Sequence, residues 1–296
     1  MSAPAPVPAA AHQAAAALRL EAPVALAAPL TIFFIAFVLM PFVLLGFVSL
    51  HNDNSLQVMG VAQYFKFFGD AFNLSVLADT LLLGLKVTLI TIVIGYPLAY
   101  LYVNASPRMQ SVLMLLILLP LLTSAVVRTF AWVVILGRQG IINTFLIDYG
   151  FVSGPVKLLY TPGAVSVALA QIELPLMVLP LITALLNVDA NLRQASLSLG
   201  AGHWRTFLQV TLPLSVPGLL AGSLLVFASS VSAFVTQTLV GGGQMMFMPF
   251  YMYQQAIQAN EYPFAAAIAM VLLVCVLVIV TVVNSLGRRS KGFVHA

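Results

Sequence analysis

Long apolar stretches constrain this chain more than any other feature of its sequence. A helix needs roughly 20 mainly apolar residues to cross the hydrocarbon core of a bilayer, which is about 30 Å thick. Six segments meet that requirement: residues 24–50, 77–103, 111–136, 163–187, 213–239 and 263–287. Backbone exposed to lipid must satisfy its own hydrogen bonds, so each segment is expected to be a helix. With 61% apolar and 7% charged residues, the chain is predicted to be an all-α polytopic membrane protein with six transmembrane helices.

The basic residues between these stretches predict how the chain crosses the membrane. If the loops alternate between the two sides, one side holds Arg19, Arg108, Arg193, Arg205, Arg288, Arg289 and Lys291, and the other holds Lys66, Arg138 and Lys157. The richer side is expected to be cytoplasmic, with both termini inside. Residues 1–22 are rich in Ala and Pro and are predicted to be a disordered cytoplasmic tail. Residues 23–287 then form the membrane domain, and residues 288–296 form a cytoplasmic C-terminal tail.

The remaining composition argues against several classes of function. Cys275 is the only cysteine, and the four histidines are scattered, so no disulfide and no metal site is expected. The chain has no phosphate-binding loop and no catalytic constellation, so by itself it is not expected to be an enzyme. The net charge of +4 fits membrane topology and contact with the lipid bilayer, and without a basic stripe interleaved with aromatics we expect no nucleic-acid partner.

The polar loop at residues 188–212 carries the sharpest motif. Its residues Gln194, Ala195, Ser196, Leu199 and Gly200, followed by Pro213, resemble the cytoplasmic signature of permease subunits of binding-protein-dependent ATP-binding cassette importers. That signature usually has glutamate where this chain has Gln194 and alanine where it has Ser196. The segments 95–100, 118–146 and 239–255 look like the branch of these permeases that handles polyamines, opines and phosphonates.

The loop residues have a physical reason to occur together. A short helix with small residues on one face can enter a groove on an ATPase, and a glycine after it lets the chain turn sharply. Pro213 fits the start of the next span, where its missing amide donor costs least. His203 and Arg205 lie in the same loop and are expected to take part in the contact.

The resemblance implies the fold and the partners. It implies the type I importer permease fold in a bacterial inner membrane, two separate ATPase subunits that bind ATP and Mg, and a periplasmic substrate-binding protein. It also implies a second homologous permease, usually a different chain, and transport of a polyamine, opine, phosphonate or related amine by alternating access. This chain itself would hold no cofactor. The alternative is an ATP-independent secondary transporter, which would leave the loop signature unexplained and would show internal repeats that we do not find.

Charged side chains inside the predicted spans are candidates for the transport pathway. Lys86, Arg128 and Glu173 would lie at similar depth, roughly 12–15 Å below the outer surface at 1.5 Å per residue. A charge at that depth is costly unless it is paired or hydrated, so a pair of Glu173 with Arg128 or with Lys86 is expected. These residues either line the pathway or form a structural ion pair. Trp132 and Gln237 are added as residues that would enclose or bind cargo. Two cations against one anion favour cargo with an anionic or zwitterionic group.

Overall fold

The computed structural model describes residues 9–291, and this part of the chain is built from helices. It contains no β-strand among the described residues, only an isolated antiparallel bridge between His51 and Met59. The elements in order are α1 (Ala9–Ser49), α2 (Ala62–Gly69), α3 (Ala71–Asn104), α4 (Pro107–Leu118), the 3₁₀ turn η1 (Leu119–Leu122), α5 (Ala125–Leu136), α6 (Ile141–Asp148), α7 (Pro162–Leu186), α8 (Ala190–Ser198), α9 (His203–Thr206), the π-helical turn η2 (Phe207–Thr211), α10 (Leu212–Ser232), α11 (Phe234–Gly241), α12 (Met248–Tyr253), the π-helical turn η3 (Gln254–Gln258) and α13 (Tyr262–Lys291).

Six of these segments are long and apolar enough to cross a membrane, which confirms the predicted number of spans. They are Pro29–Ser49, Ala71–Asn104, Ala125–Asp148, Pro162–Leu186, His203–Ser232 and Tyr262–Ser285. Four of them agree closely with the predicted ranges. The third and the fifth differ, because each predicted range contains a break in the helix.

Both breaks follow from local backbone chemistry. In the predicted span 111–136, Pro120 removes an amide donor, the helix tightens into η1, and Thr123 and Ser124 are extended before α5 begins. The apolar helical segment Pro107–Leu122 and the span Ala125–Asp148 are therefore separate elements. In the predicted span 213–239, the helix breaks at Ala233, between α10 and α11. At its other end, the fifth span extends back to His203, inside the loop predicted at residues 188–212.

Helix α7 is the centre of the bundle. Its most apolar window is 67% buried within the chain, and it packs most extensively against α3 and α10. Close packing of α10 on α7 depends on two glycines four residues apart. A Cβ at Gly222 would lie 2.9 Å from the carbonyl oxygen of Met177, and one at Gly218 would collide with Ala184. Small residues at this spacing let two membrane helices approach closely.

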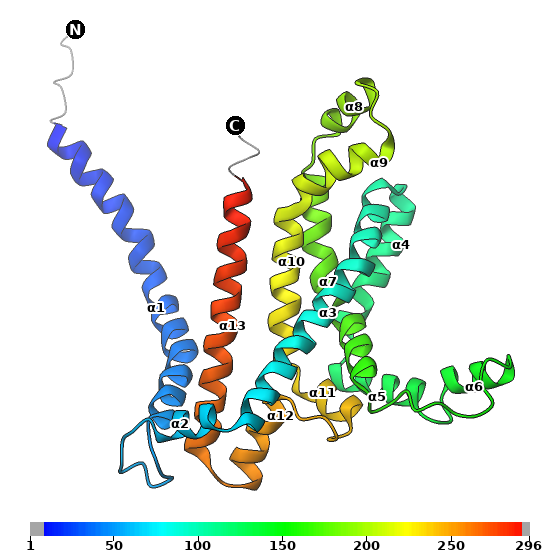
Figure 1. Cartoon of the computed structure of the whole chain (residues 1–296). Helices are drawn as coiled ribbons and strands as arrows, with labels where there is room; N and C mark the ends of the chain where they lie inside the picture. The colour runs from blue at the N-terminus through cyan, green and yellow to red at the C-terminus, as the bar shows by residue number, and fades with distance from the viewer. Residues whose placement is uncertain (1–8, 292–296) are drawn as a thin grey trace.

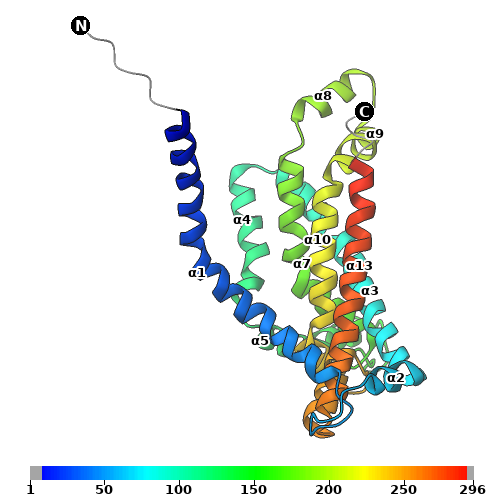
Figure 2. The same ribbon diagram turned by 90° about the vertical axis from the view of Figure 1, so that its left-hand side faces the viewer.

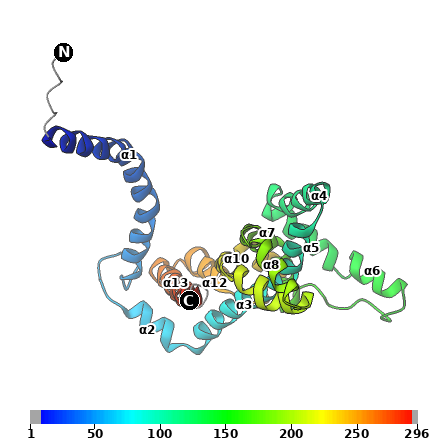
Figure 3. The same ribbon diagram turned by 90° about the horizontal axis from the view of Figure 1, so that it is seen from above.

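Helix α1 lies apart from the bundle and packs mainly on α13 (Figures 1 and 3). None of its most apolar window, within Pro29–Ser49, is buried inside the chain. Residues 1–22 were predicted to be disordered, yet α1 already begins at Ala9, while residues 1–8 lie outside the described part. The reason is local, because the alanine-rich stretch that follows has high helix propensity. Residues 288–291 of the predicted C-terminal tail continue α13, and the rest of that tail lies outside the described residues.

Candidate functional site

The two ends of the bundle differ in character. One end carries the loop of α8 and α9, together with the start of α1 and the end of α13 (Figures 1 and 2). We call it the α8 end. The opposite end carries α2, α11 and α12, and α6 projects sideways there (Figures 1 and 3). We call it the α2 end.

At the α8 end, the signature residues form a helix, a sharp turn and a second helix. Asp189 caps α8 by accepting a hydrogen bond from the amide of Asn191. The helix ends at Leu199, and Gly200 follows with φ of +84°, which lies in the region that favours glycine. The amide of Ala201 then donates to the carbonyl of Ser196, which closes the turn. Pro213 lies in the first turn of α10, where its missing donor is tolerated.

Apolar side chains are exposed at the tip of this loop. Leu199 is 88% exposed and Trp204 is 76% exposed, although the surrounding loop is polar. Leu192 and Leu208 are also exposed there, as are Gln194, Ala195, His203 and Arg205. Arg205 donates to the side chain of Gln209, one turn along the helix. Exposed apolar groups rimmed by polar groups are typical of a protein–protein contact.

The base of the loop is fixed to the spans by an aromatic cluster. Phe207 packs edge-on against Tyr96 and Tyr100 of α3 and against Trp204 of the loop. The hydroxyl of Tyr96 lies 2.8 Å from that of Ser215 in α10. Ser196 of α8 and Thr206 of α9 are joined by a hydroxyl contact of 3.0 Å. A displacement of the loop would therefore be passed to α3 and α10.

Inside the membrane, Arg128 and Glu173 come close together without forming the expected ion pair. The guanidinium Nη1 of Arg128 donates to the carbonyl oxygen of Ile172 at 3.3 Å. Glu173 is 7% exposed. Its carboxylate interacts with the hydroxyl of Ser229 and with the positive charge of Arg128. The pair of Glu173 with Lys86 is not formed either, and among the described residues the only ion pair within 4 Å is Lys66–Glu261. Arg128 therefore donates to a backbone carbonyl and not to the carboxylate of Glu173.

Gln237 stabilises the break between α10 and α11. Its amide nitrogen donates to the carbonyl oxygen of Ser230, which also accepts from the amide of Ala233 at 3.4 Å, and to the carbonyl oxygen of Val231. The side chain is 1% exposed, and its oxygen has no hydrogen-bond partner, nor has the hydroxyl of Ser230. Next to it, Thr236 contacts Thr129 of α5 at 2.9 Å. Thr129 follows Arg128 in α5 and Thr236 precedes Gln237 in α11, so polar side chains gather where α5, α7, α10 and α11 meet.

The other two predicted pathway residues lie elsewhere. Trp132 packs on the core around α7, and its indole nitrogen donates to the side chain of Gln171 at 3.1 Å. Lys86 is exposed on α3 and lines a cavity of about 400 Å³ between α3, the start of α7 and residues 244–247. Asp79 lines the same cavity. The structure therefore brings Arg128 close to Glu173 and places Gln237 at the α10–α11 break, whereas Trp132 contacts Gln171 and Lys86 lines a separate cavity.

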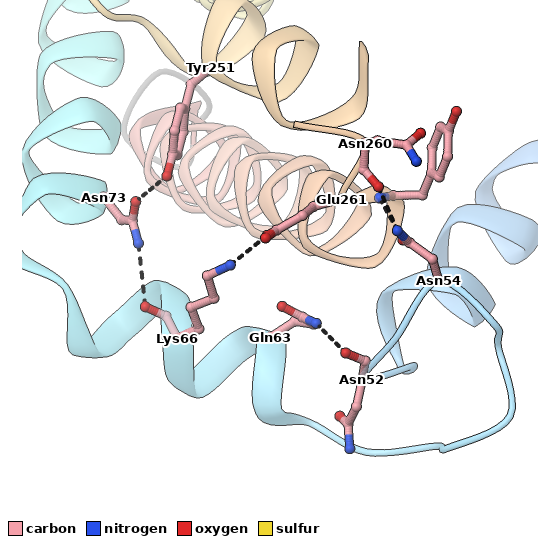
Figure 4. A network of polar contacts seen from close by, with 9 residues as sticks. Asn52, Asn54, Gln63, Lys66, Asn73, Tyr251, Asn260 and Glu261 are labelled. Carbon is pink, nitrogen blue, oxygen red and sulfur yellow. Dashed lines mark hydrogen bonds and ion pairs between the residues drawn. The ribbon is translucent and has the colours of Figure 1, made fainter. Parts of the chain in front are cut away.

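A second polar network holds the α2 end together (Figure 4). Lys66 of α2 pairs with Glu261 at the start of α13 and lies over the ring of Phe264. Asn73 accepts a hydrogen bond from Tyr251 and donates to the carbonyl of Lys66, and Asn54 donates to the carbonyl of Asn260. In the same loop, the hydroxyl of Ser55 donates to Asp53 and holds the pKa of that carboxyl below its ordinary value.

Sequence reasoning missed Asp79 and the hydroxyl group of Thr129. Asp79 was overlooked because charges near the ends of apolar stretches are common. Its spacing of seven residues from Lys86, which places both on one face of a helix, is the signal that would have found it. With Asp79 included, the six predicted spans contain two cations and two anions. The charge imbalance that favoured anionic or zwitterionic cargo is therefore not a valid argument.

Comparison with known proteins shows which of them share this sequence and architecture. The family described as "Binding-protein-dependent transport system inner membrane component" matches residues 91–291. The chain is 34% identical to the spermidine/putrescine transport system permease protein PotB of Haemophilus influenzae, over 66% of this chain and 68% of that protein. It is 31% identical to PotB of Escherichia coli, over 69% of this chain and 74% of that protein. A bacterial alginate ABC transporter, solved with an alginate-bound periplasmic protein, has a chain of the same fold with a TM-score of 0.77 and 20% identity, covering 92% of this chain and 95% of that one.

Proposed function

Because the chain belongs to the family of binding-protein-dependent transport system inner membrane components, and is a permease subunit of an ATP-binding cassette importer, we propose that its α8–α9 loop docks a separate ATPase subunit. The observation that carries the proposal is the exposed apolar tip of that loop, formed by Leu199 and Trp204. Gln194, Ala195, Ser196, Leu199, Gly200, His203, Arg205 and Pro213 are the residues assigned to this contact. Two ATPase subunits, each with ATP and Mg, would complete the transporter.

The orientation of the chain follows from the same assignment. The α8 end faces the cytoplasm, and both termini are on that side. Arg108, Arg193 and Arg205 belong to this end, as do Arg288, Arg289 and Lys291 at the end of α13, whereas Lys66, Arg138 and Lys157 belong to the α2 end. The α8 end therefore holds six of these basic residues and the α2 end three. This excess supports the orientation, because cytoplasmic loops of membrane proteins are enriched in basic residues.

The aromatic cluster at Phe207 provides a route from ATP to the membrane helices. Closure of the ATPases would move the α8–α9 loop, and Phe207 would transmit the movement to Tyr96 and Tyr100 of α3. Ser215 would carry it to α10 through its contact with Tyr96. Alternating access then consists of rocking α3 and α10 together with the central helix α7.

We assign the cargo as a small polar solute that bears an amine, delivered by a periplasmic binding protein. Support comes from the two PotB relatives, which are named for spermidine and putrescine transport. Within this chain, the proposed pathway residues are Lys86, Arg128, Trp132, Glu173 and Gln237. A second, homologous but different permease would supply the other half of the pathway. The apolar surface of α1 that faces away from its own bundle is available for contact with that partner or with lipid.

Replacement of the exposed leucine tests the docking site. Leu199→Glu places a charge on the apolar tip, and we expect it to reduce several-fold the amount of ATPase subunit that co-purifies with this chain from native membranes. Phe151→Glu is the matched control, because Phe151 is 69% exposed in the loop after α6, at the α2 end, and its replacement should leave ATPase recovery unchanged. Equal ATPase recovery with Leu199→Glu and the wild type would overturn the proposal.

A further inference from the structure

Two opposite charges on one face of α3 line a cavity and have no charged partner. Asp79 and Lys86 are seven residues apart, nearly two helical turns, which is about 10.5 Å along the axis at 1.5 Å per residue. Both are exposed, and neither forms an ion pair within 4 Å among the described residues. They line the cavity of about 400 Å³ that α3 forms with the start of α7 and with residues 244–247. That volume lies within the range of small-molecule sites in proteins.

Lipid cannot be the surroundings of these two side chains. Asp79 and Lys86 belong to the span Ala71–Asn104, and a charged group in contact with hydrocarbon costs several kcal/mol. Charged residues in spans almost always face a hydrated cavity or another protein surface. The two charges do not form an ion pair with each other. A solute in the space between them can therefore place an opposite charge beside each.

The walls of the cavity define what such a solute would look like. Phe72, Met245 and Phe247 provide apolar surface, and Ser75 and Ser166 place hydroxyl groups on it. Gln244, which also lines the cavity, accepts a hydrogen bond from the side chain of Lys157 at 3.3 Å, so a second positive charge lies near its wall. A carboxylate at one position and ammonium groups at another suit a molecule with opposite charges at its ends and an aliphatic middle.

We propose that this cavity is a solute site for a zwitterion, with its ammonium group at Asp79 and its carboxylate at Lys86. The inference rests on the transport role and orientation proposed above, which place the cavity toward the periplasm. Asp79 and Lys86 lie before residue 91, where the family match begins, so the two charges of the site are carried by a part of the chain outside the matched region. The proposed site narrows the class of cargo from amines in general to amines that also carry an acidic group. A diamine would meet Lys86 as a like charge.

Thiol labelling tests the site without depending on transport. In a Cys275→Ala background, Ser75→Cys is made in the complete transporter in native membranes, and a membrane-impermeant maleimide is added from the periplasmic side. Ser75 is exposed and lines the cavity, so labelling is expected. Leu85→Cys is the control, because Leu85 is 49% exposed but does not line the cavity, and its thiol should not be labelled.

Solutes that differ in the charges at their two ends then identify the class of ligand. The zwitterions 4-aminobutyrate and 6-aminohexanoate should slow labelling of Ser75→Cys several-fold, whereas putrescine and succinate should not. Asp79→Asn and Lys86→Met should each abolish the protection. Two results would overturn the proposal. One is that putrescine protects the thiol and still does so in the Lys86→Met variant, and the other is that no zwitterion protects it. Recovery of the ATPase from the same membranes is measured in parallel, so a failure of the importer assignment is recognised separately.

Discussion

At the scale of single residues, Gly200 decides whether the α8–α9 loop can adopt its shape. Its φ of +84° would cost about 1–2 kcal/mol for most residues, although a Cβ there would meet no other atom within 4 Å. We therefore expect Gly200→Val to lower ATP-driven uptake about tenfold, which corresponds to about 1.4 kcal/mol. Gly200→Asn should be much milder, because asparagine tolerates this conformation. ATP-driven uptake into proteoliposomes that contain all subunits measures this difference. Equal uptake with Gly200→Val and Gly200→Asn would contradict the prediction.

Gln237 supports the break between α10 and α11 in a similar way. Gln237→Leu removes the donor from the carbonyl of Val231 and leaves the carbonyl of Ser230 with only the long bond from the amide of Ala233, and a buried unsatisfied group costs about 1–3 kcal/mol. We expect a lower thermal unfolding midpoint for the purified variant. Thr238→Val is the control, because Thr238 bonds only within its own helix. Equal midpoints for the two variants would show that Gln237 does not stabilise the break.

The residues of the site differ in how far the sequence reveals them. Gln194 to Gly200 form a contiguous motif, so their place in one loop could be predicted without coordinates. The approach of Arg128 to Glu173 could be anticipated from depth, but the acceptor that Arg128 uses could not, because a backbone carbonyl leaves no mark in the sequence. Thr129 and Thr236 meet across two elements that are far apart in the chain, and only the fold brings them together.

At the scale of elements, hydropathy determines which segments are buried in lipid but not where a helix is interrupted. The prediction of six spans is confirmed. The breaks at Thr123–Ser124 and at Ala233 were missed because the residues around them are as apolar as a continuous span. Pro120 was a usable signal for the first break, whereas no proline or glycine marks Ala233.

The contact between α7 and α10 gives a prediction at the same scale. Gly222→Ile would drive a side chain into the backbone of Met177, and overpacking of this kind costs about 1–3 kcal/mol. We expect a thermal midpoint several degrees lower and less folded protein in the membrane. The neighbouring Ala221→Ile should be tolerated, because Ala221 is exposed on the same helix. A Gly222→Ile variant as stable as Ala221→Ile would contradict the close packing.

At the scale of the whole molecule, this chain is built as part of a larger assembly. Helix α1 leaves its apolar surface uncovered by the rest of the chain, and the tip of the α8–α9 loop exposes Leu199 and Trp204. The polar network of Lys66, Glu261 and Tyr251 fixes the α2 end, where the proposed binding protein would arrive (Figure 4). Under the proposed function, these separate surfaces would serve a second permease, an ATPase and a binding protein.

The most direct measurement is mild affinity purification of this chain from its native membrane, followed by identification and counting of its partners and by reconstitution into proteoliposomes. The account predicts that an ATPase and a second six-span permease come with the chain, and that solute accumulates only when ATP and the binding protein are supplied. Recovery of this chain alone, with solute accumulation in the absence of ATP, would contradict the account.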